Sequence, residues 1–370
     1  KKSSVASNFK VGGNLDATSE GTIKIQGSNI ETGGDLNLDG KNVEVLTGRN
    51  EEYSNTKTTS SSYGMFNDNE AKAGAEAGAK GGTAGGKAGG KASAEANSTT
   101  TFGVRGTTET SDSYTLKNSA SSLKSGGNMK IKAKETATFV GANVDSGGDL
   151  DINAKDIINK AAKDESRTSS SRDQSTSGVY IGGEAEAHAE GSANAGAGGA
   201  RGKGGAGASA EVSAGLRHAT EGETEFEKTT TNVTNTFKAK GNITRKAENQ
   251  ILDQGTQLEA GGDINQSARI ITEEAVHDTK ESGSSSSAMD ARVGVYAGAS
   301  ADASADSASG SADAGADASA GFKASIAGSN SGKNSTSGTA VTSKYKAGGS
   351  INSKSTEATT RVGTKFEAGK

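Results

Sequence analysis

The feature that most constrains this chain is a glycine turn that returns at fixed distances. A first set of turns is marked by Gly13, Gly127, Gly241 and Gly349, which are 114, 114 and 108 residues apart. A second set, at Gly34, Gly148 and Gly262, follows the first by 21 residues each time. Single glycines at Gly27, Gly141 and Gly255 keep the same 114-residue spacing. Repetition at a fixed period predicts a repeat architecture in which each unit packs against its neighbours.

Apolar residues keep constant positions relative to these glycines. Four residues before a marker stand Phe9, Ile30, Leu123, Val144, Phe237, Leu258 and Tyr345. Two residues after a marker stand Leu15, Leu36, Met129, Leu150, Ile243, Ile264 and Ile351. Further along come Ile23, Val43, Ile157, Ile251 and Ile271. Short alternation of apolar and polar residues is typical of half-buried strands, so we expect these side chains to form the structural core.

A circuit of about 21 residues with several short strands and glycine corners describes one coil of a parallel β-helix. Helix is disfavoured in the stretch from residue 14 to 30, which is rich in Asn, Thr, Gly and β-branched residues. The expected fold class is therefore an all-β β-solenoid, with Leu15 stacked on Leu36 and Met129 on Leu150. The turn residues are Gly13, Gly34, Gly127, Gly148, Gly241, Gly262 and Gly349. We expect them to supply positive φ, and the following Asn or Asp to bond back to the turn backbone.

Composition agrees with a thin fold. Only 30% of the 370 residues are apolar, and there are 54 glycines and no Pro, Cys or Trp. Such a chain has too few large side chains for a thick core, which leaves disorder or a solenoid one side chain deep. A net charge of −4 gives no basic surface for nucleic acid, and the absence of cysteine excludes disulfides and thiolate metal sites. The chain begins at Lys1 without a Met, and we expect it to be part of a longer protein.

The repeat divides the chain into units at 1–126, 127–240 and 241–348, with the start of a fourth at 349–370. Each full unit contains a hydroxyl-rich run followed by a Gly/Ala-rich segment, at about 70–97, 182–215 and 298–328. Ala or Gly at nearly every second position predicts a β arm with one small-residue face, which packs on neighbouring arms. A flexible linker and an Ala-rich helix are the alternatives.

No residue pattern indicates chemistry, and we predict no catalytic, cofactor-binding or metal site. His188, His218 and His277 lack the spacing of a zinc site. The "GGDLNLDG" stretch is similar to half of a calcium-binding nonapeptide repeat, but Asp35, Asp149 and Asp263 are better explained as turn residues.

Three aromatic residues lead into the Gly/Ala-rich segments. Phe66, Tyr180 and Tyr296 are expected to cap the core where an arm leaves it. The alternative is an exposed adhesive or sugar-binding stripe.

The order "GGDLNL", "NVEVLTG", "GVYIGG" and "TNTFKAKGNI" resembles the hemagglutinin repeats of filamentous-hemagglutinin-like exoproteins. These are secreted partners of two-partner secretion systems, and they include adhesins and contact-dependent growth-inhibition proteins. The resemblance implies a right-handed parallel β-helix, export by an outer-membrane two-partner-secretion transporter, and an extracellular, cell-surface location. It also implies a receptor or glycan on a host or neighbouring cell as partner.

Two functions from different classes follow. The first is a structural and adhesive fibre segment that self-associates end to end through open coils or through its arms. The second is the stalk of a toxin-delivery exoprotein. A polysaccharide-acting enzyme would need charged residues gathered in one groove, whereas Asp and Lys here are scattered over turns, so we expect no enzyme.

Overall fold

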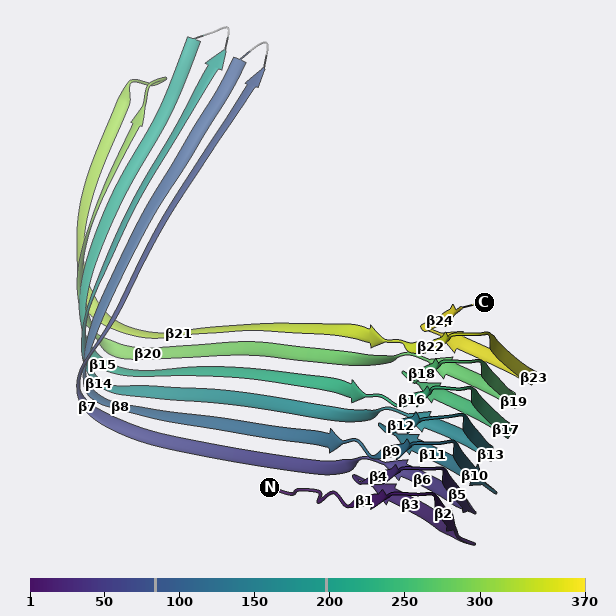
Figure 1. The fold of residues 1–370 in the computed structure, drawn as a ribbon. Coiled ribbons are helices and arrows are strands. Elements are labelled where there is room, and N and C mark those ends of the chain that lie inside the picture. Colours follow the sequence, from purple (N-terminus) through teal and green to yellow (C-terminus); the bar gives the residue numbers. More distant parts are fainter. Residues whose placement is uncertain (83–84, 197–198, 370) are drawn as a thin grey trace.

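The protein is a stack of β coils from which a broad lateral sheet projects (Figure 1). The computed structural model describes residues 1–82, 85–196 and 199–369, and every regular element among them is a strand. The prediction of an all-β chain built on parallel sheets is thereby confirmed. Within the described residues, no helix is long and apolar enough to cross a membrane.

The coils are made of short strands that pair in parallel with the coils above and below. One sheet has the order β1-β4-β9-β12-β16-β18-β22-β24. Its strands are β1 (Asn8–Val11), β4 (Asn29–Thr32), β9 (Ser122–Ser125), β12 (Asn143–Ser146), β16 (Thr236–Ala239), β18 (Gln257–Ala260), β22 (Ser343–Ala347) and β24 (Thr364–Ala368).

The second parallel sheet provides the other walls of the coils. In the N-terminal coils it is split into short strands: β2 (Leu15–Thr18), β3 (Thr22–Gln26), β5 (Leu36–Gly40), β6 (Asn42–Leu46), β10 (Met129–Ala133) and β11 (Thr136–Val140). Later coils use single longer strands: β13 (Leu150–Lys160), β17 (Ile243–Gln254), β19 (Ile264–Glu274) and β23 (Ile351–Val362). Register shifts inside the later pairs mark the corner between the two walls.

Inward side chains stack in continuous ladders through the coils. The predicted ladder of residues two places after the glycine markers runs Leu15, Leu36, Met129, Leu150, Ile243, Ile264 and Ile351. A second ladder runs Phe9, Ile30, Leu123, Val144, Phe237, Leu258, Tyr345 and Phe366. A third runs Ile23, Val43, Ala137, Ile157, Ile251 and Ile271.

Burial along these ladders depends on distance from the ends of the stack. The inner members are buried, whereas Leu15, Ile23, Ile30 and Ile351 are half-buried. The prediction that Phe9 belongs to the core is wrong, because its side chain is 53% exposed. Phe9 lies in the first coil, so it has a coil on one side only.

Six of the seven turn glycines are required by close packing rather than by positive φ, whereas Gly13 in the first coil has open space around it. None of the seven predicted turn glycines has positive φ, which corrects the expectation from sequence. Instead, a Cβ on Gly34 would collide with Oδ1 of Asn14, and a Cβ on Gly127 with Oδ1 of Asp35. Asp35, the residue after Gly34, donates its backbone N–H to Oδ1 of Asn14 at 2.9 Å.

This contact repeats from coil to coil and forms a surface ladder. The side-chain oxygens of Asn14, Asp35, Asn128, Asp149, Asn242 and Asp263 each accept the backbone N–H of the equivalent residue in the following coil. The predicted bond within the same turn is therefore replaced by a bond between coils. Asn alternates with Asp along this ladder, so no two carboxylates are stacked directly on each other.

Glycines with positive φ occur at another corner. Gly27, Gly141, Gly255 and Gly363 have φ values of 54°, 55°, 60° and 64°, and each closes a coil that continues directly into the next one. In the intervening coils the chain leaves at this corner as a long hairpin. At this corner, a glycine in the left-handed conformation in one coil thus alternates with the exit of a hairpin in the next coil.

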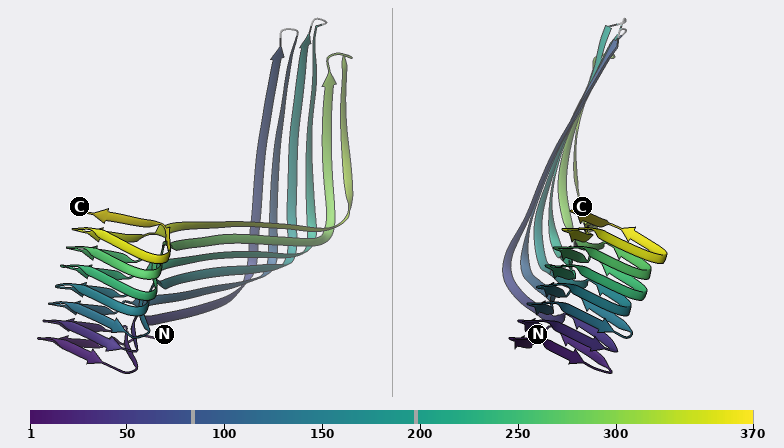
Figure 2. Two further views of the ribbon diagram at one scale, coloured as in Figure 1. Left: turned by 90° about the vertical axis from the view of Figure 1, so that its right-hand side faces the viewer. Right: turned by 45° about the vertical axis from the view of Figure 1, so that its right-hand side comes forward.

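Three hairpins form a six-stranded antiparallel sheet beside the solenoid, in the order β21-β20-β15-β14-β8-β7. Its strands are β7 (Gly48–Gly82), β8 (Gly85–Ser119), β14 (Ala162–Gly196), β15 (Gly199–Val233), β20 (Val276–Asp306) and β21 (Ser311–Val341). The predicted Gly/Ala-rich arms are the outer parts of these hairpins, which also include the hydroxyl-rich runs. We call the whole sheet the arm, with a proximal half next to the coils and a distal half beyond the bend that Figure 2 shows midway along the strands.

The repeat period follows from this architecture. Each repeat contributes two coils of about 21 residues and one hairpin. The strands of the third hairpin have 31 residues, whereas those of the first two have 35, which explains the shorter third interval. Two coils rise by two strand spacings, about 9.6 Å, and a hairpin adds two strands at the same spacing. The arm and the solenoid therefore grow in step.

Candidate functional site

The arm bends where glycines line up across its strands. Gly64, Gly103 and Gly178 lie opposite one another in β7, β8 and β14, and Gly215 lies opposite Gly294 in β15 and β20. A Cβ on Gly103 would collide with the backbone of residues 177 and 178. These glycines lie on one face of the sheet, which we call the charged face. Their missing Cβ atoms let neighbouring backbones approach closely in the middle of the strands, where the sheet bends (Figure 2).

Charged side chains join several strands across the same face. Arg217 on β15 is 6% exposed and donates to the carboxylate of Asp290 on β20 at 2.9 and 3.0 Å. It also pairs with Asp68 on β7, which lies 3.5 Å from Arg105 on β8. Arg292 contacts Asp290 at 2.8 Å. Burial alone would raise the pKa of Asp290, but hydrogen bonds from Arg292 and Arg217 outweigh it and hold this pKa below its ordinary value.

The predicted aromatic residues belong to this bend. Phe66 and Tyr180 lie on its charged face, where Arg105 stacks 4.3 Å from the Phe66 ring centre and Arg292 5.5 Å from that of Tyr180. Tyr180 is 3% exposed. The expectation that these residues and Tyr296 cap the core at the exit of an arm is wrong, because all three lie near the middle of the arm strands. Burial of Tyr180 also excludes a continuous exposed aromatic stripe.

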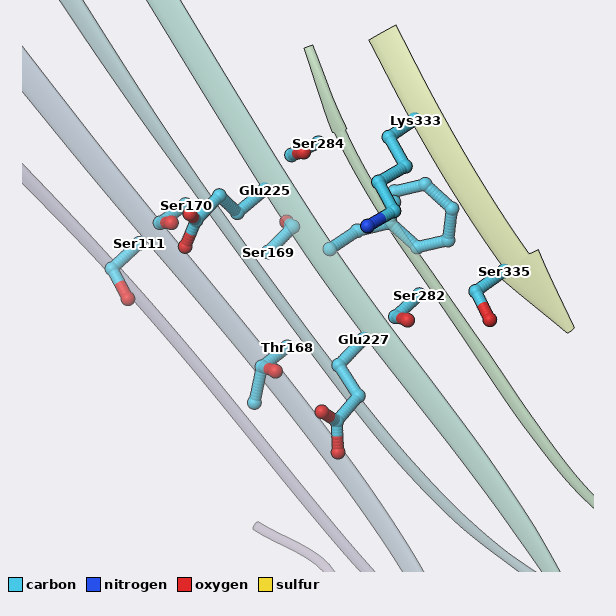
Figure 3. Close-up of a pocket in the computed structure, with 12 residues that line it drawn as sticks. Ser111, Thr168, Ser169, Ser170, Glu225, Glu227, Ser282, Ser284, Lys333 and Ser335 are labelled. Atoms are coloured by element: carbon cyan, nitrogen blue, oxygen red, sulfur yellow. The ribbon is translucent and has the colours of Figure 1, made fainter. Parts of the chain in front are cut away.

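A shallow polar depression of about 580 Å³ lies on the proximal half of the arm (Figure 3). One row across the sheet contains Ser111, Ser170, Glu225, Ser284 and Lys333. The adjacent row on the same face contains Thr168, Glu227, Ser282 and Ser335. These neighbouring hydroxyl, carboxylate and ammonium groups can donate hydrogen bonds to a polar ligand such as a sugar and accept hydrogen bonds from it.

The distal half of the arm has one face made of alanine, which we call the alanine face. Three consecutive rows across all six strands consist of alanine alone, and every one of these residues is exposed. They are Ala71, Ala96, Ala185, Ala210, Ala299 and Ala318; Ala73, Ala94, Ala187, Ala208, Ala301 and Ala316; and Ala75, Ala92, Ala189, Ala206, Ala303 and Ala314.

The same side of the sheet continues as an apolar row at the bend. Met65, Phe102, Val179, Leu216 and Val293 lie opposite one another on successive strands and are exposed. The opposite side of the distal half carries the charged residues, because side chains alternate along each strand. The arm is therefore amphipathic beyond its bend.

A buried polar cluster inside the C-terminal coils was missed by sequence reasoning. Arg245 is 0% exposed and pairs with Asp253 through two hydrogen bonds of 2.8 Å. Gln266 contacts Arg245 and donates to Glu273 at 2.7 Å, and Glu273 accepts from Arg361 at 2.9 Å. Arg245 follows its glycine marker by four residues, as Ile131 and Ile152 do, so the inward position was readable from the repeat.

The three histidines lie on different strands of the arm. In the part of the chain that the structure describes, no cluster of three or more His, Asp or Glu side chains has metal-binding geometry. His218 contacts Ser177 at 2.7 Å on the exposed side of the arm that also carries the apolar row. His188 and His277 lie on other strands of the arm.

Comparison with known proteins agrees with the repeat. A family model described as "Hemagglutinin repeat" matches residues 1–112 and 102–220. A protein named "Hemolysin" from Serratia marcescens is 26% identical over 300 residues, which are 79% of this chain and 15% of the hemolysin. The chain thus corresponds to a small part of the length of that relative.

Proposed function

Because the chain belongs to the hemagglutinin repeat family, we propose that it is a structural and adhesive segment of a secreted bacterial surface exoprotein. The observation that carries the proposal is the joint growth of solenoid and arm, in which each repeat extends a rod and widens a lateral sheet. In this proposal the ladders provide length and stiffness, and the outer surfaces provide contact. No enzymatic activity is part of it.

We propose export through an outer-membrane two-partner-secretion transporter to the extracellular surface. A chain without Pro has no slow X-Pro isomerisation, and a chain without Cys forms no disulfides in an oxidising periplasm. Both properties favour a polypeptide that stays unfolded during passage. We also propose that the coils wind to the right, since crossovers between parallel strands of one sheet are right-handed in about 98% of cases.

The ligand that we propose is a glycan or receptor on a host or neighbouring cell, bound at the polar depression on the proximal arm. Glu225, Glu227 and Lys333 supply charged groups, and the surrounding hydroxyls match the hydrogen-bonding groups of sugars. The open end coils offer unpaired strand edges, which favour end-to-end association of an isolated segment.

The test of adhesion is binding of the purified chain to a panel of immobilised glycans and to cell monolayers. We expect the double change Glu225→Ala and Lys333→Ala to reduce binding at least about tenfold, since it removes charge-assisted hydrogen bonds. A control pair, Glu44→Ala and Lys344→Ala, removes the same charges from the solenoid and is expected to bind as the unchanged chain does. If both variants bind equally well, the depression is not the binding site. If the unchanged chain binds none of the glycans or cells, the proposal of adhesion is wrong.

A second candidate function is the stalk of a contact-dependent toxin-delivery exoprotein. The observation that favours it is the match to 15% of a much longer hemolysin, since a stalk is one part of a larger protein. The coding sequence beyond Lys370 distinguishes the two candidates: a compact domain of ordinary composition favours delivery, and further repeats favour a fibre.

A further inference from the structure

The alanine face is an exposed apolar surface of unusual size. With strands about 4.8 Å apart and a rise of about 3.4 Å per residue, its three rows cover roughly 600 Å². The next row toward the tips adds further small residues, among them Ala77, Ala305 and Ala312. Together these rows cover roughly 800 Å², which is the area that each partner contributes to a standard protein interface. Monomeric proteins rarely leave a contiguous apolar patch of this size in water.

The shape of this face selects the kind of surface that can cover it. Methyl groups of equal height in register make an even layer of small side chains, which follows the twist of the sheet and has no pockets or knobs. A partner with large side chains would leave voids against such a layer, whereas a second alanine layer with the same twist fits it closely. The three rows also contain no charged residue that would be desolvated by the contact.

Charges on the other face of the sheet argue against a lipid surface. At the level of the alanine rows this face carries Glu95, Glu184, Glu186, Glu190 and Glu211. Surfaces that bind membranes combine Lys or Arg on the polar side with Trp, Phe or Leu on the apolar side. At the level of the alanine rows, the polar side is rich in carboxylates and the apolar side is made of methyl groups. The larger apolar side chains on this side, such as Phe102 and Leu216, lie at the bend and outside these rows. When two alanine faces meet, the carboxylates point outward on both sides and stay in water.

We propose that the distal arm docks face to face on the distal arm of a second copy of this chain through the alanine face. The contact buries the three alanine rows of both copies and joins two rods side by side. It differs from end-to-end association, which uses the coils, and it does not depend on the ligand of the proximal arm. Bundles of rods linked through their arms follow from it.

The test compares two single changes at adjacent positions. Ala208→Lys places a charge in the alanine face, and Ser209→Lys places the same charge on the opposite face of the same strand. In sedimentation velocity across a concentration series, we expect Ala208→Lys to weaken dimerisation at least about a hundredfold, because an unpaired ammonium would be desolvated. Ser209→Lys keeps the dimerisation of the unchanged chain. Both side chains are free to enter water in the monomer, and circular dichroism checks that each variant is folded.

Cross-linking identifies the surface that is used. The chain contains no cysteine, so Ala208→Cys and Ser209→Cys each introduce a single thiol. With a short bis-maleimide, the proposal expects dimers from Ala208→Cys and none from Ser209→Cys. A monomer at all concentrations overturns it. If the chain associates and Ala208→Lys does not weaken this association, docking through the alanine face is wrong, and end-to-end association through the coils explains the result. If the unchanged chain co-sediments with phosphatidylcholine vesicles and Ala208→Lys abolishes this co-sedimentation, the alanine face binds a membrane surface and the proposed docking is wrong.

Discussion

At the scale of the residue, stability depends on side chains that meet their equivalents in neighbouring coils. Leu150 lies between Met129 and Ile243 in the longest aliphatic ladder and is 0% exposed. Each wall of the coils contributes one inward layer of side chains, and Leu150 has aliphatic side chains above and below it in its own layer. Each fully buried Leu or Ile contributes about 1.5–3 kcal/mol, and stability therefore accumulates along the stack.

Replacing Leu150 by Asp tests this assignment. The carboxylate would be buried between aliphatic neighbours without a partner, and we expect a loss of at least about 3 kcal/mol in the free energy of unfolding. Urea unfolding followed by circular dichroism measures the change. Asn153→Asp is the matched control, since its side chain is exposed between Lys132 and Lys246 in the adjacent coils. A stable Leu150→Asp variant would show that this side chain does not point inward.

The buried cluster around Arg245 is the exception to the aliphatic core. Desolvation opposes the charge on Arg245, but the interactions with Asp253 and Tyr345 outweigh it and raise the pKa of the guanidinium. A buried pair of this kind adds little net stability relative to apolar residues, but removal of one partner is costly. Its members lie on β17, β19 and β23, so the cluster links three successive coils through side-chain hydrogen bonds.

At the scale of the element, the arm hairpins leave the solenoid at one corner, and their strands pair with each other and with no strand of the coils. β8 pairs with β14, and β15 with β20, so the three hairpins hold one another in a single sheet. The coil ladders involve none of these strands. The coils and the distal arm are therefore expected to fold independently.

Shortening one hairpin tests that independence. Val179 lies opposite Leu216, so replacement of residues 180–215 by Asn-Gly joins the strands through a favourable two-residue turn. We expect the shortened protein to keep the circular dichroism of a β-rich fold and the urea midpoint of the solenoid. Loss of that signal would show that the distal arm is needed for the coils to fold.

The sequence predicted the coils better than the arm. The period of the glycine markers places Leu36, Met129 and Leu150 on one ladder, because stacking in a solenoid follows directly from equivalent positions in the repeat. The bend and the position of Tyr180 depend on pairing between hairpins that lie far apart in sequence. Alternation within one segment predicts a strand with a small-residue face, but it carries no information on which strands are neighbours.

The corners show a similar division. The prediction of positive φ at the marker turns is wrong for Gly34, and positive φ occurs instead at Gly27, which was not among the predicted turn residues. At Gly34 the constraint is the Asn14 side chain of the preceding coil, a contact that exists only after the coils have stacked. Local preference and packing both select glycine, and the sequence does not separate the two causes.

At the scale of the whole molecule, the shared strand spacing links the solenoid to the arm. Each repeat adds two coils to the rod and two strands to the lateral sheet, so neither part is strained as repeats are added. Had hairpins left at every coil, the arm would need about twice the space that the rod provides. Alternation of glycine corners with hairpin exits keeps the two in step.

A cryo-electron microscopy reconstruction of the purified chain tests the central claim most directly. The claim is that inward side chains at equivalent positions stack into ladders that hold successive coils together. It predicts a rod of coils spaced by about 4.8 Å, with one hairpin leaving at every second coil, so that the hairpins repeat every 9.6 Å or so. A globular particle, a helical chain or coils without this stacking would contradict it.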